Sequence, residues 1–155
     1  MERFYPIGIG VLLIGIIALV LFKFVFVPQR QGTFRIEKID VMPVLDLDGN
    51  KLHLSDLLSK DSDTYFLIFN LNDCLGCIYK GLEELKSLDN AGKTCFGLVI
   101  DDYFQEVATW ASHYEFSHFL VIKRIDFYEH IKSPVTPVLV RFRNQEVDSW
   151  WYFTP

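Results

Sequence analysis

Two cysteines three residues apart, Cys74 and Cys77, are the residues of this sequence best suited to chemistry. They enclose Leu75-Gly76, directly after an apolar run at residues 65–69 and directly before a segment with helical periodicity. A cysteine at the start of a helix faces unpaired N–H groups and the positive end of the helix dipole, which stabilise a thiolate. A second cysteine one turn later lies on the same side and can attack a mixed disulfide formed by the first. The spacing therefore predicts Cys74 as an exposed nucleophile and Cys77 as a more buried resolving thiol.

A Cys-x-x-Cys pair is also half of a common zinc site, so the motif alone leaves metal binding open. A structural zinc ion takes four ligands, and the sequence contains no second cysteine pair. The third cysteine, Cys95, stands alone in an apolar run, and we expect it to be a buried small hydrophobic residue. We predict no metal and no cofactor, because the histidines also lack ligand spacing; they are His53, His113, His118 and His130.

Length and composition indicate one globular domain. The chain has 155 residues, of which 50% are hydrophobic, and its formal net charge is −5. The hydrophobic share is too high for a disordered chain, and three cysteines are too few for a disulfide-framework mini-protein. Nucleic acids bind proteins with a basic surface, so the acidic balance argues against nucleic acid as a partner.

The N-terminus contains an apolar stretch, residues 7–27, whose only charge is Lys23 near its end. As a helix this stretch would span roughly 31 Å, about the thickness of the hydrocarbon core of a bilayer. A cleaved signal peptide would have a shorter apolar region followed by a small-x-small site, and this stretch ends in Phe-Val-Pro-Gln. We therefore predict a transmembrane anchor with a short linker in residues 1–32 and a globular domain in residues 33–155.

The globular part alternates strand and helix signals, which predicts a mixed central sheet with helices on its faces. Residues 44–54 alternate around Asp48-Gly49-Asn50, as is typical of a β-hairpin, and Ser55 is a candidate N-cap for a short helix after it. Asp101 or Asp102 is expected to cap a later helix. The other predicted elements are strands at 65–69, 94–100 and 119–122, helices at 74–88 and from 104 to 111, a short segment at 127–131, and a terminal hairpin of 138–142 and 147–153.

These motifs resemble the membrane-anchored thioredoxin-like proteins of the TlpA/ResA kind. The resemblance rests on the hairpin running into residues 54–57, the strand at 65–70, Cys74-Leu75-Gly76-Cys77 and Thr136-Pro137, and it covers most of residues 40–153. It implies a thioredoxin-like α/β fold, with a mixed central sheet flanked by helices, an N-terminal β-hairpin extension and an N-terminal transmembrane helix. It also implies that Pro137 follows a cis bond and packs against the redox pair, and that Thr136 offers backbone groups to a substrate chain.

The sequence departs from the family pattern at three positions near the cysteines. Asp73 stands where tryptophan is usual, Gly76 where the dipeptide usually has proline, and Lys80 where cytochrome-maturation members often have an acid. The charge of Asp73 would oppose the effect of the helix N-terminus on Cys74. We therefore predict that Cys74 is not strongly acidified, which favours a reductase or exchange role over a powerful oxidant.

The leading interpretation is a membrane-tethered thiol–disulfide oxidoreductase that acts on cysteine-containing proteins through Cys74 and Cys77. Disulfides persist outside the cytoplasm, so we expect a single-pass protein of the cytoplasmic membrane whose catalytic domain faces the periplasm or the cell exterior. The positive-inside rule opposes this orientation, because more basic residues follow the apolar stretch than precede it. The upstream redox partner is open.

Two other functions remain as alternatives. Two thiolates suit Cu(I), which allows a thioredoxin-fold metallochaperone, although those proteins space their cysteines one residue wider and add a histidine. A peroxiredoxin-type peroxidase would share the N-terminal hairpin. Its Pro-x-x-x-Thr/Ser-x-x-Cys signature is absent, since Leu71 stands where the hydroxyl residue would be.

Overall fold

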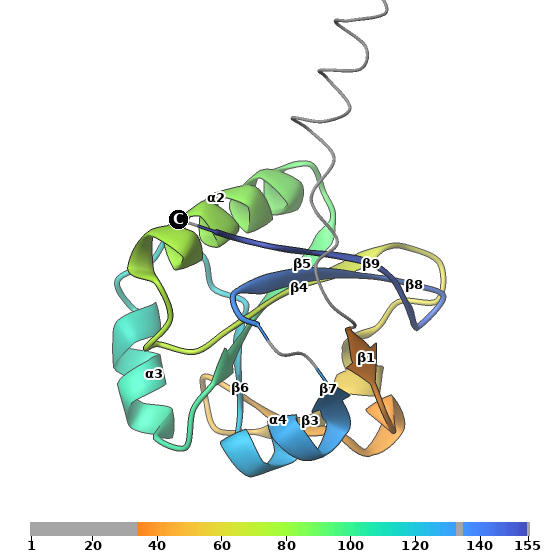
Figure 1. The fold of residues 1–155 in the computed structure, drawn as a ribbon, viewed down its shortest axis with the longest axis horizontal. Coiled ribbons are helices and arrows are strands. Elements are labelled where there is room, and N and C mark those ends of the chain that lie inside the picture. Colours follow the sequence, from red (N-terminus) through yellow and green to blue (C-terminus); the bar gives the residue numbers. More distant parts are fainter. Residues whose placement is uncertain (1–33, 133–134, 155) are drawn as a thin grey trace, which may run out of the picture.

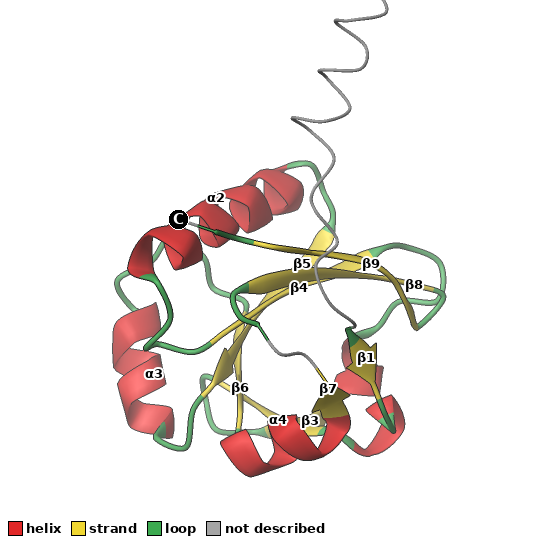
Figure 2. Cartoon of the chain, viewed as in Figure 1, coloured by secondary structure: helices red, strands yellow, loops and turns green. Residues whose placement is uncertain are grey.

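The computed structural model describes residues 34–132 and 135–154, whose strands build a mixed sheet with helices on both faces (Figures 1 and 2). The strands are β1 (Arg35–Ile36), β2 (Pro43–Asp46), β3 (Lys51–His53), β4 (Thr64–Phe69), β5 (Thr94–Ile100), β6 (Phe119–Ile122), β7 (Ile131–Lys132), β8 (Val138–Arg143) and β9 (Glu146–Tyr152). The helices are α2 (Leu75–Asn90), α3 (Phe104–Ala111) and α4 (Arg124–His130), with two 3₁₀ turns, η1 (Ile39–Val41) and η2 (Leu54–Leu57).

The main sheet has the strand order β3-β2-β6-β5-β4-β8-β9. β4, β5 and β6 run parallel, and the remaining neighbours pair antiparallel. Parallel neighbours need a crossover, and α2 and α3 supply the two crossovers. β4 lies near the centre and is buried along its whole length. The carboxyl ends of β4, β5 and β6 therefore share one edge of the sheet, from which all three helices begin.

Each face of the sheet packs against its own hydrophobic cluster. Alternate residues of β4 point to opposite faces: Phe66 and Ile68 belong to the cluster that includes Phe127 of α4. Leu67 and Phe69 belong to the cluster that contains the inner faces of α2 and α3. The sheet therefore lies between α2 and α3 on one side and α4 with the β1–β7 ribbon on the other (Figure 1).

The mixed sheet, both hairpins and the predicted helix after Cys74 are confirmed. The predicted N-cap at Ser55 is wrong: η2 begins one residue earlier, at Leu54, and no side chain caps it. The carboxylate of Asp101 accepts the N–H of Tyr103 at 2.9 Å just before α3. The predicted cap of α3 by Asp101 or Asp102 is therefore wrong: its N-cap residue is Tyr103, and no side-chain cap bond is made there. Asp102 instead accepts the N–H of Arg124, the first residue of α4, at 3.1 Å.

The predicted transmembrane anchor in residues 1–32 lies outside the described residues. Within the residues that the structure describes, every helix is too short or too polar to cross a bilayer. The short ribbon of β1 with β7 was not predicted, because each strand has only two residues and carries no recognisable alternation.

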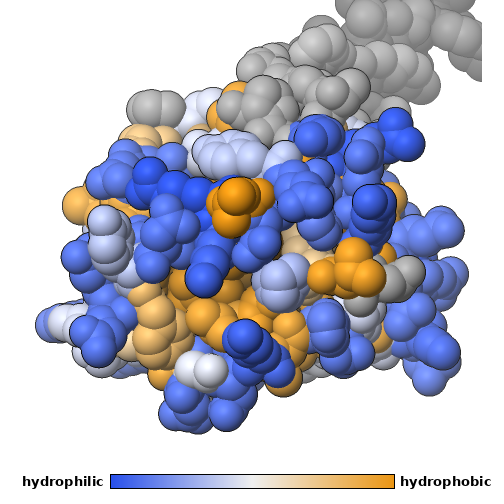
Figure 3. Space-filling view, turned by 90° about the horizontal axis from the view of Figure 1, so that it is seen from below, coloured by the Kyte–Doolittle hydropathy of each residue, from blue (hydrophilic) through white to orange (hydrophobic). Residues whose placement is uncertain are grey.

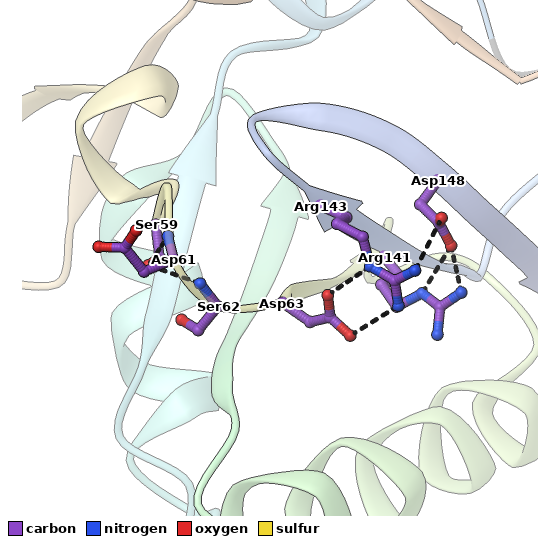
Figure 4. Close-up of polar contacts among 7 residues, drawn as sticks. All are labelled: Ser59, Asp61, Ser62, Asp63, Arg141, Arg143 and Asp148. Atoms are coloured by element: carbon purple, nitrogen blue, oxygen red, sulfur yellow. Dashed lines mark hydrogen bonds and ion pairs between the residues drawn. The ribbon is translucent and has the colours of Figure 1, made fainter.

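A charged network ties the last two strands to the chain before β4 (Figure 4). Arg143 of β8 donates to Asp63 at 3.0 Å and 3.3 Å and lies 3.6 Å from Asp148 of β9. Arg141 donates to the same Asp148 carboxylate. The network lies at the amino end of β4, at the opposite end of that strand from the cysteine pair.

Candidate active site

A compact turn connects the end of β4 to α2 and sets the position of Cys74. Asn70 and Asp73 bind each other across it: the N–H of Asn70 donates to Oδ2 of Asp73 at 2.8 Å, and the N–H of Asp73 donates to the carbonyl of Asn70 at 3.0 Å. The Asn70 amide also accepts the N–H of Asn72 at 2.9 Å and donates to the carbonyl of Ile100, the last residue of β5, at 3.1 Å. The turn is therefore fixed both internally and to the neighbouring strand.

Cys74 is the N-cap residue of α2, as predicted, and is exposed. Its carbonyl accepts the first helical hydrogen bonds, from Cys77 at 2.9 Å and from Ile78 at 3.0 Å. Cys77 lies one turn along the helix and is only 1% exposed. The structure thus gives the two cysteines the unequal exposure that the spacing predicts.

The pKa values of the two thiols are shifted in opposite directions. The Cys77 thiol donates a hydrogen bond to the Cys74 sulfur, and this bond, with backbone N–H groups of Cys77 and Gly76 and the charge of Lys80, holds the pKa of Cys74 below its ordinary value. Donating that bond raises the pKa of Cys77, and burial and the neighbouring Cys74 raise it further. The first thiol is thus the readier thiolate, and the second stays protonated at a pH where the first has ionised.

The charge of Asp73 affects the second cysteine. Its carboxylate is bound to the Asn70 N–H, and its negative charge contributes to raising the pKa of Cys77. Lys80, one turn beyond Cys77, acts in the opposite sense and lowers the pKa of both thiols. Asp73 is not among the groups that chiefly shift the pKa of Cys74, so the opposition to the helix N-terminus that the sequence predicted at Cys74 is found at Cys77 instead. The opposing charge of Lys80 was considered from the sequence only as a departure from the family pattern.

Thr136 and Pro137 reach the same edge of the sheet from β8. Ile68 of β4 pairs with Val138, so antiparallel register places Pro137 beside Phe69, the last residue of β4. Pro137 is buried, Thr136 is half-buried, and the bond between them is cis, as the resemblance implied. The structure therefore brings both predicted segments of the site, the cysteine pair and Thr136-Pro137, to one end of β4.

Sequence reasoning missed the positioning roles of Asn70 and Asp73. Asparagine and aspartate that bond backbone groups two or three residues away are a standard turn signal, and the pattern Asn70-x-x-Asp73 carries it. Sequence reasoning assigned Asn70 to the strand and considered Asp73 only as a charge. Their partners explain why the chain leaves the sheet at Asn70.

The other sulfur and metal candidates lie elsewhere. Cys95 is 1% exposed within β5, as expected of a small hydrophobic residue, and burial raises its pKa to about 12. Within residues 34–132 and 135–154, His, Cys, Asp and Glu side chains do not gather in threes as a metal site would need. Leu71, which stands at the peroxidase hydroxyl position, packs against the core cluster beneath α2 and α3.

No protein-family model matches the chain, and no curated protein matches it in sequence. Its structure is similar to several solved ones. An uncharacterized thioredoxin-like protein from Porphyromonas gingivalis gives a TM-score of 0.60 at 16% identity, over 76% of this chain and 82% of that one. A thiol:disulfide interchange protein from Bacteroides sp. gives 0.59 at 13% identity, over 79% and 82%. A thio-disulfide isomerase from Thermus thermophilus gives 0.59 at 13% identity, over 78% and 87%. These similarities establish the thioredoxin-like fold of the chain.

Proposed function

We propose that this protein is a thiol–disulfide oxidoreductase whose redox centre is Cys74 and Cys77. The observation that carries the proposal is the asymmetry of the pair: Cys74 is exposed at a helix N-terminus with a lowered pKa, and Cys77 is buried one turn behind it with a raised pKa. A nucleophile must meet its substrate, whereas a resolving thiol has to reach only the first sulfur. The arrangement serves both needs.

In the reducing direction, the Cys74 thiolate attacks one sulfur of a substrate disulfide. A mixed disulfide forms, and the other substrate sulfur leaves as a thiolate. Cys77 then gives its proton to the departed substrate thiolate and attacks the Cys74 sulfur, which forms the Cys74–Cys77 disulfide and releases the second substrate sulfur as a thiolate. The substrate gains two electrons and the pair loses two. The same steps in reverse oxidise a dithiol, and the charge of Asp73 next to the pair favours reduction or exchange.

The surface around Cys74 supports a protein as the substrate. Three large hydrophobic residues, each close to the start of a helix at this edge, are exposed: Leu75 at 56%, Tyr103 at 66% and Ile125 at 73%. They follow β4, β5 and β6, three neighbouring strands spaced about 4.8 Å apart. Figure 3 looks onto the side where α4 lies in Figure 1, across the sheet from α2, and shows that hydrophobic side chains reach the surface there too, among hydrophilic ones. The exposed side chain of Leu75, next to Cys74, suits contact with the apolar side chains that flank a cysteine in a polypeptide.

We also propose that residues 1–32 tether the domain to the cytoplasmic membrane, with Cys74 facing the periplasm or the cell exterior. The support is the length of the apolar stretch and the persistence of disulfides outside the cytoplasm. A thiol reagent that cannot cross membranes should label Cys74 in intact cells. Labelling only after lysis would place the domain inside and contradict this orientation.

Alkylation gel shifts test the redox function directly. After mild oxidation and denaturation, the wild-type protein should be alkylated at one cysteine instead of three. Treatment with reductant should restore alkylation at all three. The Cys95→Ser variant should lose and regain the same pair. The Cys77→Ser variant, incubated with a disulfide-bonded protein, should accumulate a mixed disulfide that Cys74→Ser does not form. Absence of a reversible Cys74–Cys77 disulfide would overturn the proposed function.

A further inference from the structure

The last described residues cross from the Pro137 strand to the helix that carries the cysteines. The N–H of Phe153 donates to the carbonyl of Pro137 at 3.2 Å. One residue later, the carbonyl of Thr154 accepts a hydrogen bond from Nζ of Lys80 in α2, also at 3.2 Å. The segment Phe153–Thr154, here called the C-terminal strap, therefore contacts both halves of the candidate site.

Gly81 lets the C-terminal strap lie close to α2. A Cβ at this position would be 3.2 Å from Cε2 of Phe153 and 2.6 Å from Cδ1 of Leu67, so only glycine leaves both side chains in place. Phe153 also belongs to the residues packed on the cluster beneath α2. The strap is thus seated on the helix by packing as well as by the Lys80 hydrogen bond.

Lys80 lies one turn beyond Cys77, which places it on the same side of α2 as the buried thiol. Two charged side chains flank the pair: Asp73 before it and Lys80 after it. Of these, Lys80 carries the positive charge, and its ammonium group is held by the strap instead of by a carboxylate. A carbonyl fixes the position of the charge without cancelling it.

We propose that Lys80 is a positioning residue of the redox pair: the C-terminal strap holds its ammonium group behind Cys77, where the charge stabilises the anionic sulfur of the reduced state. The proposal rests on the proposed function and deepens it. A charge that stabilises the reduced pair makes the disulfide a better oxidant. Lys80 thus offsets Asp73, and the strap couples this adjustment to the strand that carries Pro137.

Thiol reactivity tests this without requiring turnover. In a Cys77→Ser, Cys95→Ser background, Lys80→Gln should slow iodoacetamide alkylation of Cys74 near neutral pH about two- to threefold at low ionic strength. The difference should disappear in ~1 M salt, where charges are screened within about 3 Å. Lys80→Arg should keep the wild-type rate. Lys86→Gln is the matched control, since Lys86 is on the same helix and its charge is paired with Glu115.

With both cysteines present, Lys80→Gln should shift the equilibrium with glutathione toward the disulfide about two- to threefold, and Lys80→Arg should not. Equal rates in Lys80→Gln and wild type, or an equal effect of Lys86→Gln, would overturn the role of Lys80. A Phe153→Ala variant that reacts as wild type while Lys80→Gln is slow would overturn the role of the strap. If the wild type forms no reversible disulfide, the proposed function fails, whereas the alkylation rates still decide whether Lys80 acts on Cys74.

Discussion

The carboxylate of Asp73 accepts the backbone N–H of Asn70 at 2.8 Å, and this contact closes the turn that leads from the sheet to the redox pair. The carbonyl of Asn70 accepts the N–H of Asp73, and the side-chain amide of Asn70 donates to the carbonyl of Ile100, which anchors the turn to β5. The residue directly before the first cysteine is therefore part of the scaffold, whatever its charge does to the thiols. Cys74 is held at the helix start by backbone hydrogen bonds.

Loss of the Asn70 amide should loosen this turn. Asn70→Ala removes the bond to the Ile100 carbonyl and the acceptor for the Asn72 N–H, so we expect the free energy of unfolding to fall by about 1–3 kcal/mol. The rate of disulfide exchange should fall too, because Cys74 and Cys77 lose their fixed orientation. Denaturant unfolding and the gel-shift assay measure the two effects. Asn72 is an exposed neighbour in the same turn, so Asn72→Ala is the control and should change neither the free energy of unfolding nor the exchange rate. An Asn70→Ala protein with wild-type stability and exchange rate would contradict the scaffold role.

Reactivity of the three cysteines should follow their pKa values. The pKa of Cys74 is lowered, so its thiolate fraction and its alkylation rate should reach a plateau at lower pH than those of an unstructured cysteine. Cys95, with a pKa raised to about 12 and 1% exposure, should react only after unfolding. Mass spectrometry of protein alkylated across a pH series measures each site. Faster labelling of Cys77 than of Cys74 in the folded protein would reverse the assigned roles.

Gly81 should tolerate substitution less well than Gly76, although both lie in α2. A Cβ at Gly81 would be 2.6 Å from Cδ1 of the fully buried Leu67, so overpacking should lower the stability of Gly81→Ala by about 1–3 kcal/mol. At Gly76 nothing lies within 4 Å, and Gly76→Ala should be neutral or stabilising by up to about 1 kcal/mol. Denaturation midpoints compare the two. Equal stability of both variants would contradict the predicted overpacking and show that the side chains of Leu67 and Phe153 move aside at little cost.

The elements with strong local patterns were predictable from the sequence, and contacts between distant segments were not. The apolar run of β4 and the helical spacing after Cys74 indicate their structures directly, and turn residues mark the hairpin before η2. The bond between Lys80 and Thr154 joins residues 74 positions apart, and no local pattern indicates it. Ser55 shows the opposite failure: it has the chemistry of an N-cap, but the chain already turns at Leu54, whose side chain enters the core.

The same distinction applies to the site. Spacing alone predicted that Cys74 would be exposed and Cys77 buried, since a helix that begins after a buried strand must present its first residue at the edge of the sheet. The proximity of Pro137 depends on β8 pairing with β4, which the sequence indicates only through resemblance. The two charges beside the thiols, from Asp73 and Lys80, were visible as residues, but their partners depend on the fold.

Acid should weaken the network of Asp63, Arg143, Asp148 and Arg141. Hydrogen bonds from Arg143 and from Arg141 hold the pKa of Asp63 and of Asp148, respectively, below the ordinary value of 3.8. A carboxylate whose pKa is lowered by folding contributes stability that is complete above the unfolded value and is lost as the pH falls through the folded value. We therefore expect these two groups to leave the denaturation midpoint unchanged between about pH 5 and about pH 7. At pH values below about 4, the midpoint should decrease.

Asp148→Asn should lower the midpoint at neutral pH and reduce the acid dependence, because it removes the carboxylate that joins the two arginines. Asp61→Asn is the matched control and should behave as wild type, because Asp61 lies in the same loop as Asp63 and donates its backbone N–H, which the substitution keeps, to Ser59. The network lies at the amino end of β4, so disulfide exchange by Asp148→Asn at neutral pH should match the wild-type rate at temperatures where it remains folded. An acid dependence that Asp148→Asn leaves unchanged would assign the acid sensitivity to other carboxylates.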